Sequence, residues 1–203
     1  MGIRQRRERE KSEVRQSILT AAREIALQEG WQAVTIRKVA ERIEYSPAAL
    51  YEYFASKDAI LTALLREGFR RLLVALQTAI ASATEPETRL MRLIDGYWDF
   101  AWHNPELYQV MHGLDGVDFD CFDSPIEAEE VFMTVRNELE AWANHNGTTI
   151  ANMEDCVDIL WGMAHGLVSL TLANRVWEGA ERTKALMRQG VLALLQTWRA
   201  NGQ

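Results

Sequence analysis

The amino-acid sequence predicts an all-α fold, and three observations support this prediction. Apolar residues recur three and four positions apart through most of the chain, which is the spacing of amphipathic helices. No segment alternates apolar and polar residues as a half-buried strand does. The 4 prolines all stand where a helix can begin, because a first helical residue does not use the N–H that proline lacks: Pro47, Pro86, Pro105 and Pro125.

The N-terminal part of the chain is expected to form four helices. The first covers residues 12–28 and ends before Gly30, a residue type that favours helix ends. Thr35 can cap a short second helix, and Ser46 can open a third helix that ends near Phe54. Ser56 caps a long fourth helix, whose apolar face consists of Leu61, Leu64, Leu65, Phe69, Leu72, Leu73, Leu76 and Ile80.

Five further helices are expected in the rest of the chain. Ser124-Pro125-Ile126-Glu127 has the pattern of a capping box at a helix start. The stretch 113–123 is rich in Gly and Asp and is expected to be a loop. A tight turn at Glu178-Gly179 joins the last two helices. The expected ranges are 86–104, 105–112, 125–146, 152–177 and 181–200.

The composition indicates a globular protein of the cytoplasm. Of the 203 residues, 48% are hydrophobic and 25% are charged, which is enough apolar material for a core. Cys121 and Cys156 are isolated in the sequence, which is typical of a reducing compartment. The N-terminal residues are too charged for a signal peptide, and no apolar run reaches the roughly 18 residues of a membrane span. We therefore expect a cytoplasmic location and no membrane partner.

The net charge of −7 conceals an asymmetry along the chain. Residues 1–57 contain 11 Lys and Arg against 8 Asp and Glu, whereas residues 58–203 contain 11 against 21. A basic end on an acidic body is typical of a protein that presents one end to phosphate groups, although a solvated basic tail would give the same charges. Residues 1–11 are expected to form a mobile basic arm, followed by domains over 12–60 and 61–203.

The first three expected helices have the proportions of a helix-turn-helix unit, since the last two are short and a brief turn separates them. In such a unit the second short helix enters the major groove of DNA. The helix over 46–54 would direct small residues towards base edges and turn Leu50 and Phe54 inward. Lys57 stands at the start of a helix, where the macrodipole disfavours a cation, and a helix N-terminus with a lysine makes a phosphate site.

Residues 35–60, TIRKVAERIEYSPAALYEYFASKDAI, resemble the DNA-binding signature of the tetracycline-repressor (TetR) family. The match is carried position by position by Leu50, Tyr51, Phe54, Ser56, Lys57 and Asp58. Glu44 departs from the pattern because the family usually has a turn glycine there, and a positive φ would strain a glutamate. The resemblance implies that DNA is contacted by Thr35, Arg37, Ser46, Pro47, Ala48, Ala49, Tyr51, Glu52, Tyr53 and Lys57.

The C-terminal part resembles one subgroup of TetR-like domains. Residues 161–166 are similar to its Trp…His-Gly motif, and residues 104–111 are also similar to that subgroup. Gly162 and Gly166 are four positions apart on one helix face, which permits close helix packing inside the subunit or across a dimer. Together with the apolar stripe of the last helix they give the candidate dimer interface: Gly162, Gly166, Leu186, Val191, Leu194, Leu195 and Trp198.

Aromatic residues cluster between positions 97 and 112 and recur at Trp142 and Trp161. Such a cluster is usually core, but a helix that is apolar nearly all round can also line a ligand pocket. For His165, a hydrogen-bonded core role is the alternative to ligand binding. The candidate pocket residues are Trp98, Trp102, His103, Tyr108, Met111, His112, Trp161 and His165.

The predicted function is that of a homodimeric transcriptional repressor. We expect it to bind a pseudo-palindromic double-stranded DNA operator and to be released by an unknown small-molecule effector. One alternative is a helical small-molecule sensor or interaction module that does not bind DNA directly. Another is a small helical enzyme, which is disfavoured because GxSxG, Walker, HExxH and GxGxxG motifs are absent. The acidic residues of 113–123 do not fit a calcium loop, and no cofactor or metal is expected.

Overall fold

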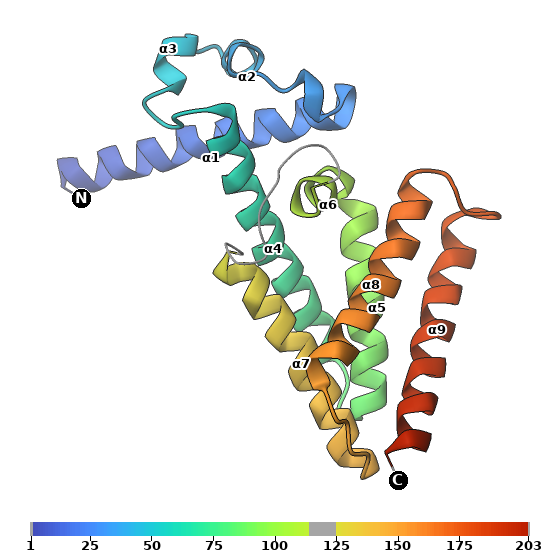
Figure 1. Cartoon of the computed structure of the whole chain (residues 1–203). Helices are drawn as coiled ribbons and strands as arrows, with labels where there is room; N and C mark the ends of the chain where they lie inside the picture. The colour runs from blue at the N-terminus through green and yellow to red at the C-terminus, as the bar shows by residue number, and fades with distance from the viewer. Residues whose placement is uncertain (1, 114–124, 203) are drawn as a thin grey trace. The chain divides into compact units, whose positions relative to one another are not determined.

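The computed structural model describes residues 2–113 and 125–202, and those residues form α-helices and one 3₁₀-helix (Figure 1). The all-α prediction is therefore confirmed for the described part of the chain. The elements are α1 (Ile3–Glu29), η1 (Trp31–Ala33), α2 (Ile36–Arg42), α3 (Pro47–Leu50), α4 (Lys57–Ala81), α5 (Pro86–His103), α6 (Pro105–Met111), α7 (Ile126–Asn146), α8 (Met153–Leu172) and α9 (Gly179–Asn201). None of these helices is both long enough and apolar enough to cross a membrane.

The chain divides into two compact units. Unit 1 consists of Met1–Gly68 and Pro105–Asp123, and unit 2 consists of Phe69–Asn104 and Ser124–Gln203. The expected boundary at residue 60 placed residues 105–112 in the C-terminal domain, whereas α6 belongs to unit 1. The long helix α4 contributes residues to both units.

The core of unit 1 forms around the second part of α1. Ile18, Ala22 and Ile25 recur at helical spacing on α1 and are fully buried. Helix α6 packs against α1, where the Arg23 guanidinium donates two hydrogen bonds to Glu106 Oε1, at 2.9 Å and 2.6 Å. The indole N–H of Trp31 donates to the Glu106 carbonyl oxygen at 3.2 Å. These bonds tie α6 to the helices before it.

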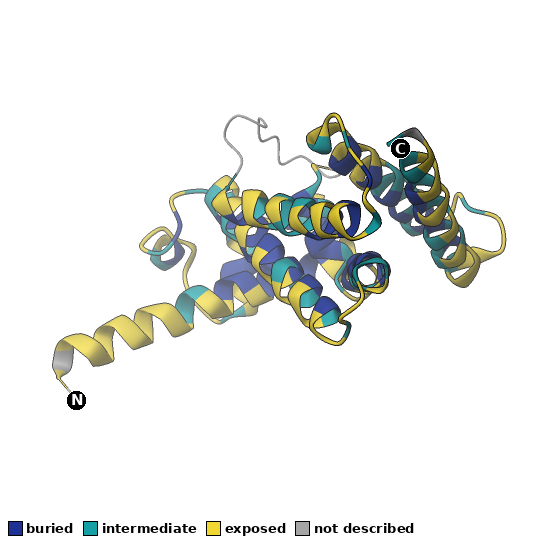
Figure 2. Ribbon diagram, turned by 90° about the horizontal axis from the view of Figure 1, so that it is seen from below, coloured by how far each residue is buried: buried dark blue, intermediate teal, exposed yellow. Residues whose placement is uncertain are grey.

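The expected mobile arm is a correction, because residues 3–11 continue α1 as a regular helix. This part of α1 is exposed around its whole circumference, as Figure 2 shows, so packing against a core does not explain its helical form. Three ion pairs at i,i+4 spacing stabilise it: Arg4–Glu8, Arg6–Glu10 and Arg9–Glu13. The glutamates that reduce the positive charge of the segment are thus the residues that order it.

The helix-turn-helix caps form as predicted. The Thr35 hydroxyl accepts the Lys38 N–H at 3.2 Å, and the Ser46 hydroxyl accepts the Ala49 N–H at 3.1 Å. Glu44 has a φ of 59°, so a glutamate occupies the left-handed turn position that favours glycine. The third helix is shorter than the expected 46–54, because α3 ends at Leu50 and the chain continues in turns to Phe54.

Unit 2 contains α5, α7, α8 and α9 with the second part of α4. Leu90, Trp142, Leu160 and Val191 come from different helices and are all buried. The Arg89 guanidinium forms two hydrogen bonds to the Glu138 carboxylate, at 2.7 Å and 2.5 Å, and thereby joins α5 to α7. A closely packed contact joins α4 to α5, since a Cβ at Gly96 would lie 3.0 Å from the Ala79 Cβ.

Two expected boundaries in unit 2 change. Helix α8 ends at Leu172 instead of continuing to residue 177. Asn174 and Glu178 have left-handed φ values of 53° and 66°, which a right-handed helix cannot include, so the connection to α9 is a longer turn. Helix α7 begins at Ile126 with Pro125 before it. The predicted cap at Ser124, and all of the expected loop 113–123 after Gly113, lie outside the described residues.

Candidate nucleic-acid interface

The helix-turn-helix of unit 1 presents its polar side to solvent. Leu50 and Phe54 are 0% and 3% exposed, as predicted for the inward side of the third helix. Tyr51, between them, is 57% exposed. Of the residues predicted to contact DNA, Thr35, Arg37, Ser46, Pro47, Ala48, Tyr51 and Glu52 are exposed, and Ala49, Tyr53 and Lys57 are half-buried.

The two cap residues retain hydrogen-bond donors for a partner. The hydroxyl oxygens of Thr35 and Ser46 accept backbone N–H groups, so each O–H can still donate. Lys57 donates one hydrogen bond to the Trp31 carbonyl oxygen at 3.0 Å. An ammonium group has three N–H bonds, and this contact holds Lys57 in place while two of them stay available.

The basic residues of α2 differ in their partners. Lys38 pairs with Glu29, and Arg42 pairs with Glu24 at 3.2 Å, so both are bound to α1. Arg37 is exposed and forms no ion pair with any residue that the structure describes. Among the basic residues of α2, Arg37 is therefore the cation that can bind an external anion without breaking an internal pair.

Arg15 supports the segment that follows α3. Its guanidinium donates to the Tyr53 carbonyl oxygen at 2.5 Å and lies 4.0 Å from the centre of the Phe54 ring. A cation over an aromatic face is attracted by the ring quadrupole. Arg15 thus fixes the backbone that carries Tyr53 and connects α3 to Lys57.

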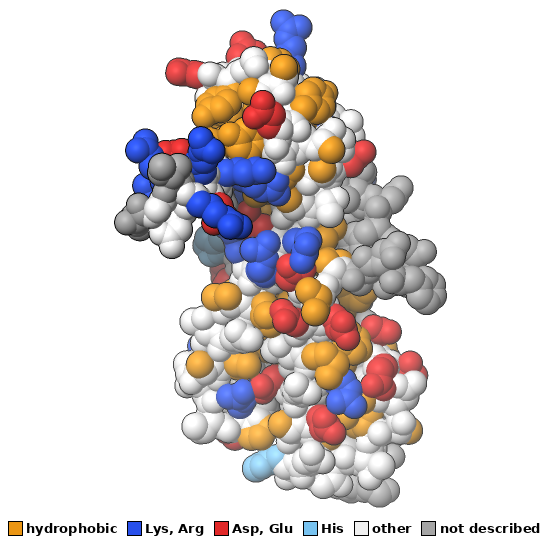
Figure 3. All heavy atoms as spheres, turned by 90° about the vertical axis from the view of Figure 1, so that its left-hand side faces the viewer, with side chains coloured by type: hydrophobic (Ala, Val, Ile, Leu, Met, Phe, Trp, Pro, Cys, Tyr) orange, Lys and Arg blue, Asp and Glu red, His pale blue; other side chains and the backbone are white. Residues whose placement is uncertain are grey.

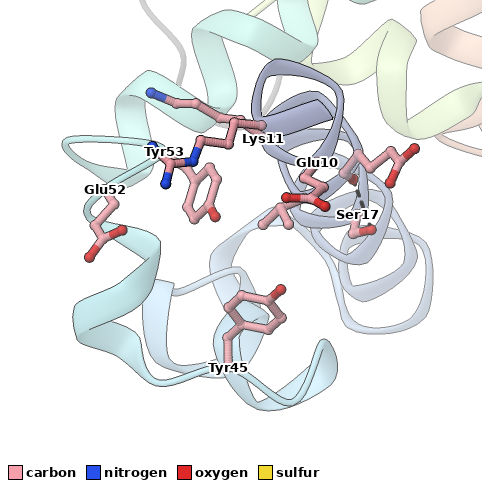
Figure 4. Close-up of a pocket in the computed structure, with 9 residues that line it drawn as sticks. Glu10, Lys11, Ser17, Tyr45, Glu52 and Tyr53 are labelled. Carbon is pink, nitrogen blue, oxygen red and sulfur yellow. Dashed lines mark hydrogen bonds between the residues drawn. The ribbon is translucent and has the colours of Figure 1, made fainter. Parts of the chain in front are cut away.

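An open hollow lies between α1 and the helix-turn-helix (Figure 4). Lys11 and Glu10 come from α1, Tyr45 from the turn between α2 and α3, and Tyr53 from the segment after α3. The hollow is lined by Arg7, Glu10, Lys11, Glu13, Val14, Ser17, Tyr45, Glu52 and Tyr53. Figure 3 shows Lys and Arg side chains gathered over the N-terminal end of α1, which is the end that borders this hollow.

Sequence comparison assigns both parts of the chain. Residues 18–64 match the bacterial regulatory proteins of the tetR family, and residues 90–194 match a tetracyclin repressor-like C-terminal domain. The second match alone covers more than half of the 203 residues. The chain belongs to the TetR family. Neither match confirms the subgroup expected from the Trp…His-Gly motif.

Two curated relatives are transcriptional regulators. The activator FasR of Mycolicibacterium smegmatis is 27% identical over 107 residues, which cover 53% of this chain and 49% of FasR. The repressor KstR of the same species is 33% identical over 99 residues, which cover 49% of this chain and 48% of KstR. The chain spans about half of the length of the curated relatives it matches.

A solved structure of the repressor-like fold covers nearly the whole chain. RolR, solved in complex with resorcinol, has a TM-score of 0.66 and 14% sequence identity, and the match covers 94% of this chain and 90% of RolR. At that identity the likeness shows the fold alone. The TetR fold therefore extends through both units of this chain.

The predicted pocket residues of this TetR-family chain divide between the units. In unit 2, Trp98 is buried and stacks on the exposed Trp102, with ring centres 6.2 Å apart. Trp161, also exposed, lies 6.1 Å from the half-buried His165 ring. His103 is exposed and its Nδ1 lies 2.7 Å from the Asp99 carbonyl oxygen.

The other predicted pocket residues belong to unit 1. Tyr108 and Met111 are fully buried, and Tyr108 stacks on His112 with ring centres 4.3 Å apart. Met111 packs against Gly68, where a Cβ would clash with its sulfur. These residues fill the core between α4 and α6, so in unit 1 the ordinary core interpretation of the aromatic cluster holds for Tyr108 and Met111.

The predicted dimer residues also divide. Val191 and Leu195 are 1% and 2% exposed, so they are core residues of unit 2 and are not available to a partner. This is a correction: the apolar stripe of α9 that contains them faces α5 and α8 of the same chain. Leu186, Leu194 and Trp198 are half-buried.

The two glycines of α8 lie on its open side. A Cβ added at Gly162 or Gly166 would meet no atom within 4 Å, so neither glycine permits close packing inside the subunit. Exposed apolar side chains follow the same face of α8: Ile159 is 48% exposed and Leu170 is 45% exposed. Leu192 adds an exposed apolar side chain on α9.

Sequence reasoning missed several residues that organise this site. Arg15 gave no signal because its partners, Tyr53 and Phe54, are 38 and 39 positions away. Tyr45 stands directly before the capping residue Ser46, and its 43% exposure in the turn places it at the hollow. An exposed aromatic beside a helix-turn-helix turn is the signal that would have identified it.

Proposed function

We propose that this protein is a transcriptional repressor that binds double-stranded DNA through unit 1 and responds to a small molecule. The observation that supports DNA binding most strongly is the exposed helix-turn-helix, whose caps, Arg37 and Lys57 all retain donors. KstR, a repressor, and FasR, an activator, both match this chain. We place the chain with the repressors, because a protein that occupies an operator blocks transcription without further contacts.

Recognition follows from the side chains around α3. Ala48 and Pro47 are exposed and small, so the backbone of α3 can approach base edges, and the Ala48 methyl can contact a thymine methyl. Tyr51, Tyr53 and Lys57 offer hydroxyl and ammonium donors to phosphates on one side of α3. Thr35 and Arg37 offer donors at the start of α2. Phosphate contacts set the register, and the α3 contacts select the sequence.

Two copies of the chain are proposed to bind one operator. The exposed face of α8 with Ile159, Gly162, Gly166 and Leu170, extended by Leu192 on α9, would form a four-helix interface with the same face of a second copy. A two-fold interface repeats one patch on both subunits, which presents two α3 segments to the two half-sites of a pseudo-palindrome. The half-buried Leu194 and Trp198 would lie at its edge.

The effector is proposed to be a small apolar or aromatic molecule bound in unit 2. The Trp98–Trp102 stack and the Trp161–His165 pair supply aromatic faces, and His165 supplies a polar atom. RolR is a fold neighbour solved with resorcinol, an aromatic ligand. For release to occur, the effector must bind more tightly to the dimer whose α3 segments no longer match the operator. The Trp161–Gly166 segment places this chain in the Trp…His-Gly subgroup that we propose for it.

The experiment that tests this function measures DNA binding by fluorescence anisotropy. Duplex fragments from the DNA that flanks the protein's own gene are titrated with the chain between 50 and 300 mM salt, a range chosen about the physiological ionic strength. The wild-type chain is expected to prefer one fragment. Lys57→Gln should lower affinity for every fragment and reduce the slope of log K against log salt by about 0.9, one phosphate contact.

The matched variant tests sequence recognition separately. Ala48→Gln should change which fragment is preferred, while the salt slope stays at the wild-type value, because Ala48 contacts no phosphate in this proposal. Circular dichroism confirms that each variant is folded. Absence of binding to any duplex by the folded wild-type chain would contradict the proposal and favour a sensor that does not bind DNA.

A further inference from the structure

We propose that the first part of α1, residues 3–13, is a preformed phosphate-binding helix in which Arg7 and Lys11 alone bind the backbone of duplex DNA. We refer to these residues as the α1 extension. The inference rests on the proposed function and adds a second DNA-binding surface to it. Its ligand class is the phosphodiester backbone beside the bases that α3 reads.

The ion pairs of the α1 extension decide which cations are available. Arg4 pairs with Glu8 at 3.3 Å, Arg6 with Glu10 at 2.7 Å, and Arg9 with Glu13 at 3.4 Å. Each arginine in these pairs already has a carboxylate partner. Arg7 and Lys11 have no ion pair with any residue that the structure describes.

Arg7 and Lys11 also share one helix face. They are four residues apart, which separates them by about 6 Å along the helix axis and puts them on the same side. Both line the open hollow beside α3, together with the phenols of Tyr45 and Tyr53. Figure 4 shows Lys11 extending from α1 towards Tyr53.

The carboxylates of the hollow do not cancel these two cations. Glu10 and Glu13 line it, but their charges are balanced by Arg6 and Arg9. Glu52 is the third carboxylate, and it forms no ion pair within the described part of the chain. The hollow therefore carries two available cations against one available anion, and its two tyrosine hydroxyls can donate to phosphate oxygens.

The helical form of the α1 extension favours binding. A segment that is already ordered loses less conformational entropy when it meets a ligand than a flexible basic tail does. The glutamates reduce the total charge of the segment but fix Arg7 and Lys11 beside the hollow. Phosphate binding should therefore depend on these two positions and not on the number of arginines.

The test compares substitutions that remove the same charge from different positions. Arg7→Gln and Lys11→Gln are measured by fluorescence anisotropy on the preferred duplex across a salt series. Arg4→Gln is the matched control, because Arg4 lies on the same helix and pairs with Glu8, which does not line the hollow. Glutamine is a good helix former, and circular dichroism verifies that helix content is unchanged.

Each of Arg7→Gln and Lys11→Gln is expected to raise the dissociation constant about five-fold near 0.15 M salt and to reduce the salt slope by about 0.9. The double variant should lose about 1.8 from the slope, and Arg4→Gln should change the affinity less than about two-fold. Equal losses in all three single variants would overturn the inference, since they would show that only net charge matters.

The failure of this inference and the failure of the proposed function are distinguishable in the same assay. If Lys57→Gln weakens binding while Arg7→Gln and Lys11→Gln do not, the α1 extension has no phosphate role and the helix-turn-helix retains its own. If the wild-type chain binds no duplex, the proposed function fails with it.

Discussion

The ion pair between Arg89 and Glu138 is the strongest internal polar contact of unit 2, and its removal should be costly. The Glu138 side chain is 10% exposed, and both of its oxygens accept hydrogen bonds from Arg89. Arg89 also donates to the carbonyl oxygens of Ile80 and Ala83 at the end of α4, at 3.2 Å each. The bond to Glu138 is the main reason that the pKa of Arg89 lies above its ordinary value.

Arg89→Met removes the charge and leaves the buried Glu138 carboxylate without its cation. Breaking a buried pair from one side costs about 3–5 kcal/mol. The lower end applies, because the Arg89 side chain is 29% exposed and water can reach the site. A loss of about 3 kcal/mol lowers Tm by about 6–12 °C in a chain of this size.

Urea unfolding followed by circular dichroism at fixed protein concentration measures this loss. The control is Arg136→Met, since Arg136 pairs with Glu140 and Glu154, whose side chains are 49% and 58% exposed. Exposed pairs contribute about 0–1 kcal/mol. Combining Arg89→Met with Glu138→Leu should recover part of the loss, because no buried charge is then unpaired. Equal losses in Arg89→Met and Arg136→Met would refute the reasoning.

Three other predictions follow from single positions. Glu44→Gly should raise the free energy of unfolding by about 1 kcal/mol, because glycine adopts the φ of 59° without strain, while Glu44→Ala should give no such gain in the same urea assay. Ile159→Glu should yield monomers by light scattering at micromolar concentration, since a charge in a two-fold interface acts twice, and Leu27→Glu, on the exposed side of α1, should leave the dimer intact; a persistent Ile159→Glu dimer would exclude the proposed interface. Burial lowers the pKa of His165 from its ordinary 6.5, so the unfolded chain is protonated first and the free energy of unfolding should fall as the pH decreases below about 6.5. His165→Gln should reduce this pH dependence in urea titrations at pH 7.5 and 5.5, and an unchanged profile would show that another group is responsible.

The sequence predicted the elements of the helix-turn-helix because their signals are local. Thr35 and Ser46 cap helices through bonds to residues three positions on, and Pro47 marks a helix start by its own chemistry. Leu50 and Phe54 were predicted to face inward from their spacing alone, and both are buried. Glu44 at a turn position was likewise readable, since the residues around it set the turn.

The partners of long-range contacts could not be predicted in the same way. Glu106 binds Arg23 from 83 positions away, and Glu138 binds Arg89 from 49 positions away. Val191 and Leu195 belong to an apolar stripe, but a stripe does not reveal whether it faces its own chain or a second copy. The α1 extension was misread for a different reason: its three ion pairs stabilise a helix without any apolar face, and apolar periodicity was the signal used to find helices.

Selection of duplexes from a random-sequence pool by the full chain tests the central claim most directly. The account predicts enrichment of an inverted repeat whose half-site centres lie about 10–10.5 base pairs apart, or a multiple of that spacing, because two α3 segments of a dimer must enter major grooves on one side of the duplex. The Lys57→Gln variant should enrich the same repeat more weakly. A recovered pool indistinguishable from the starting pool, with folded protein present throughout, would contradict the claim that this chain reads DNA.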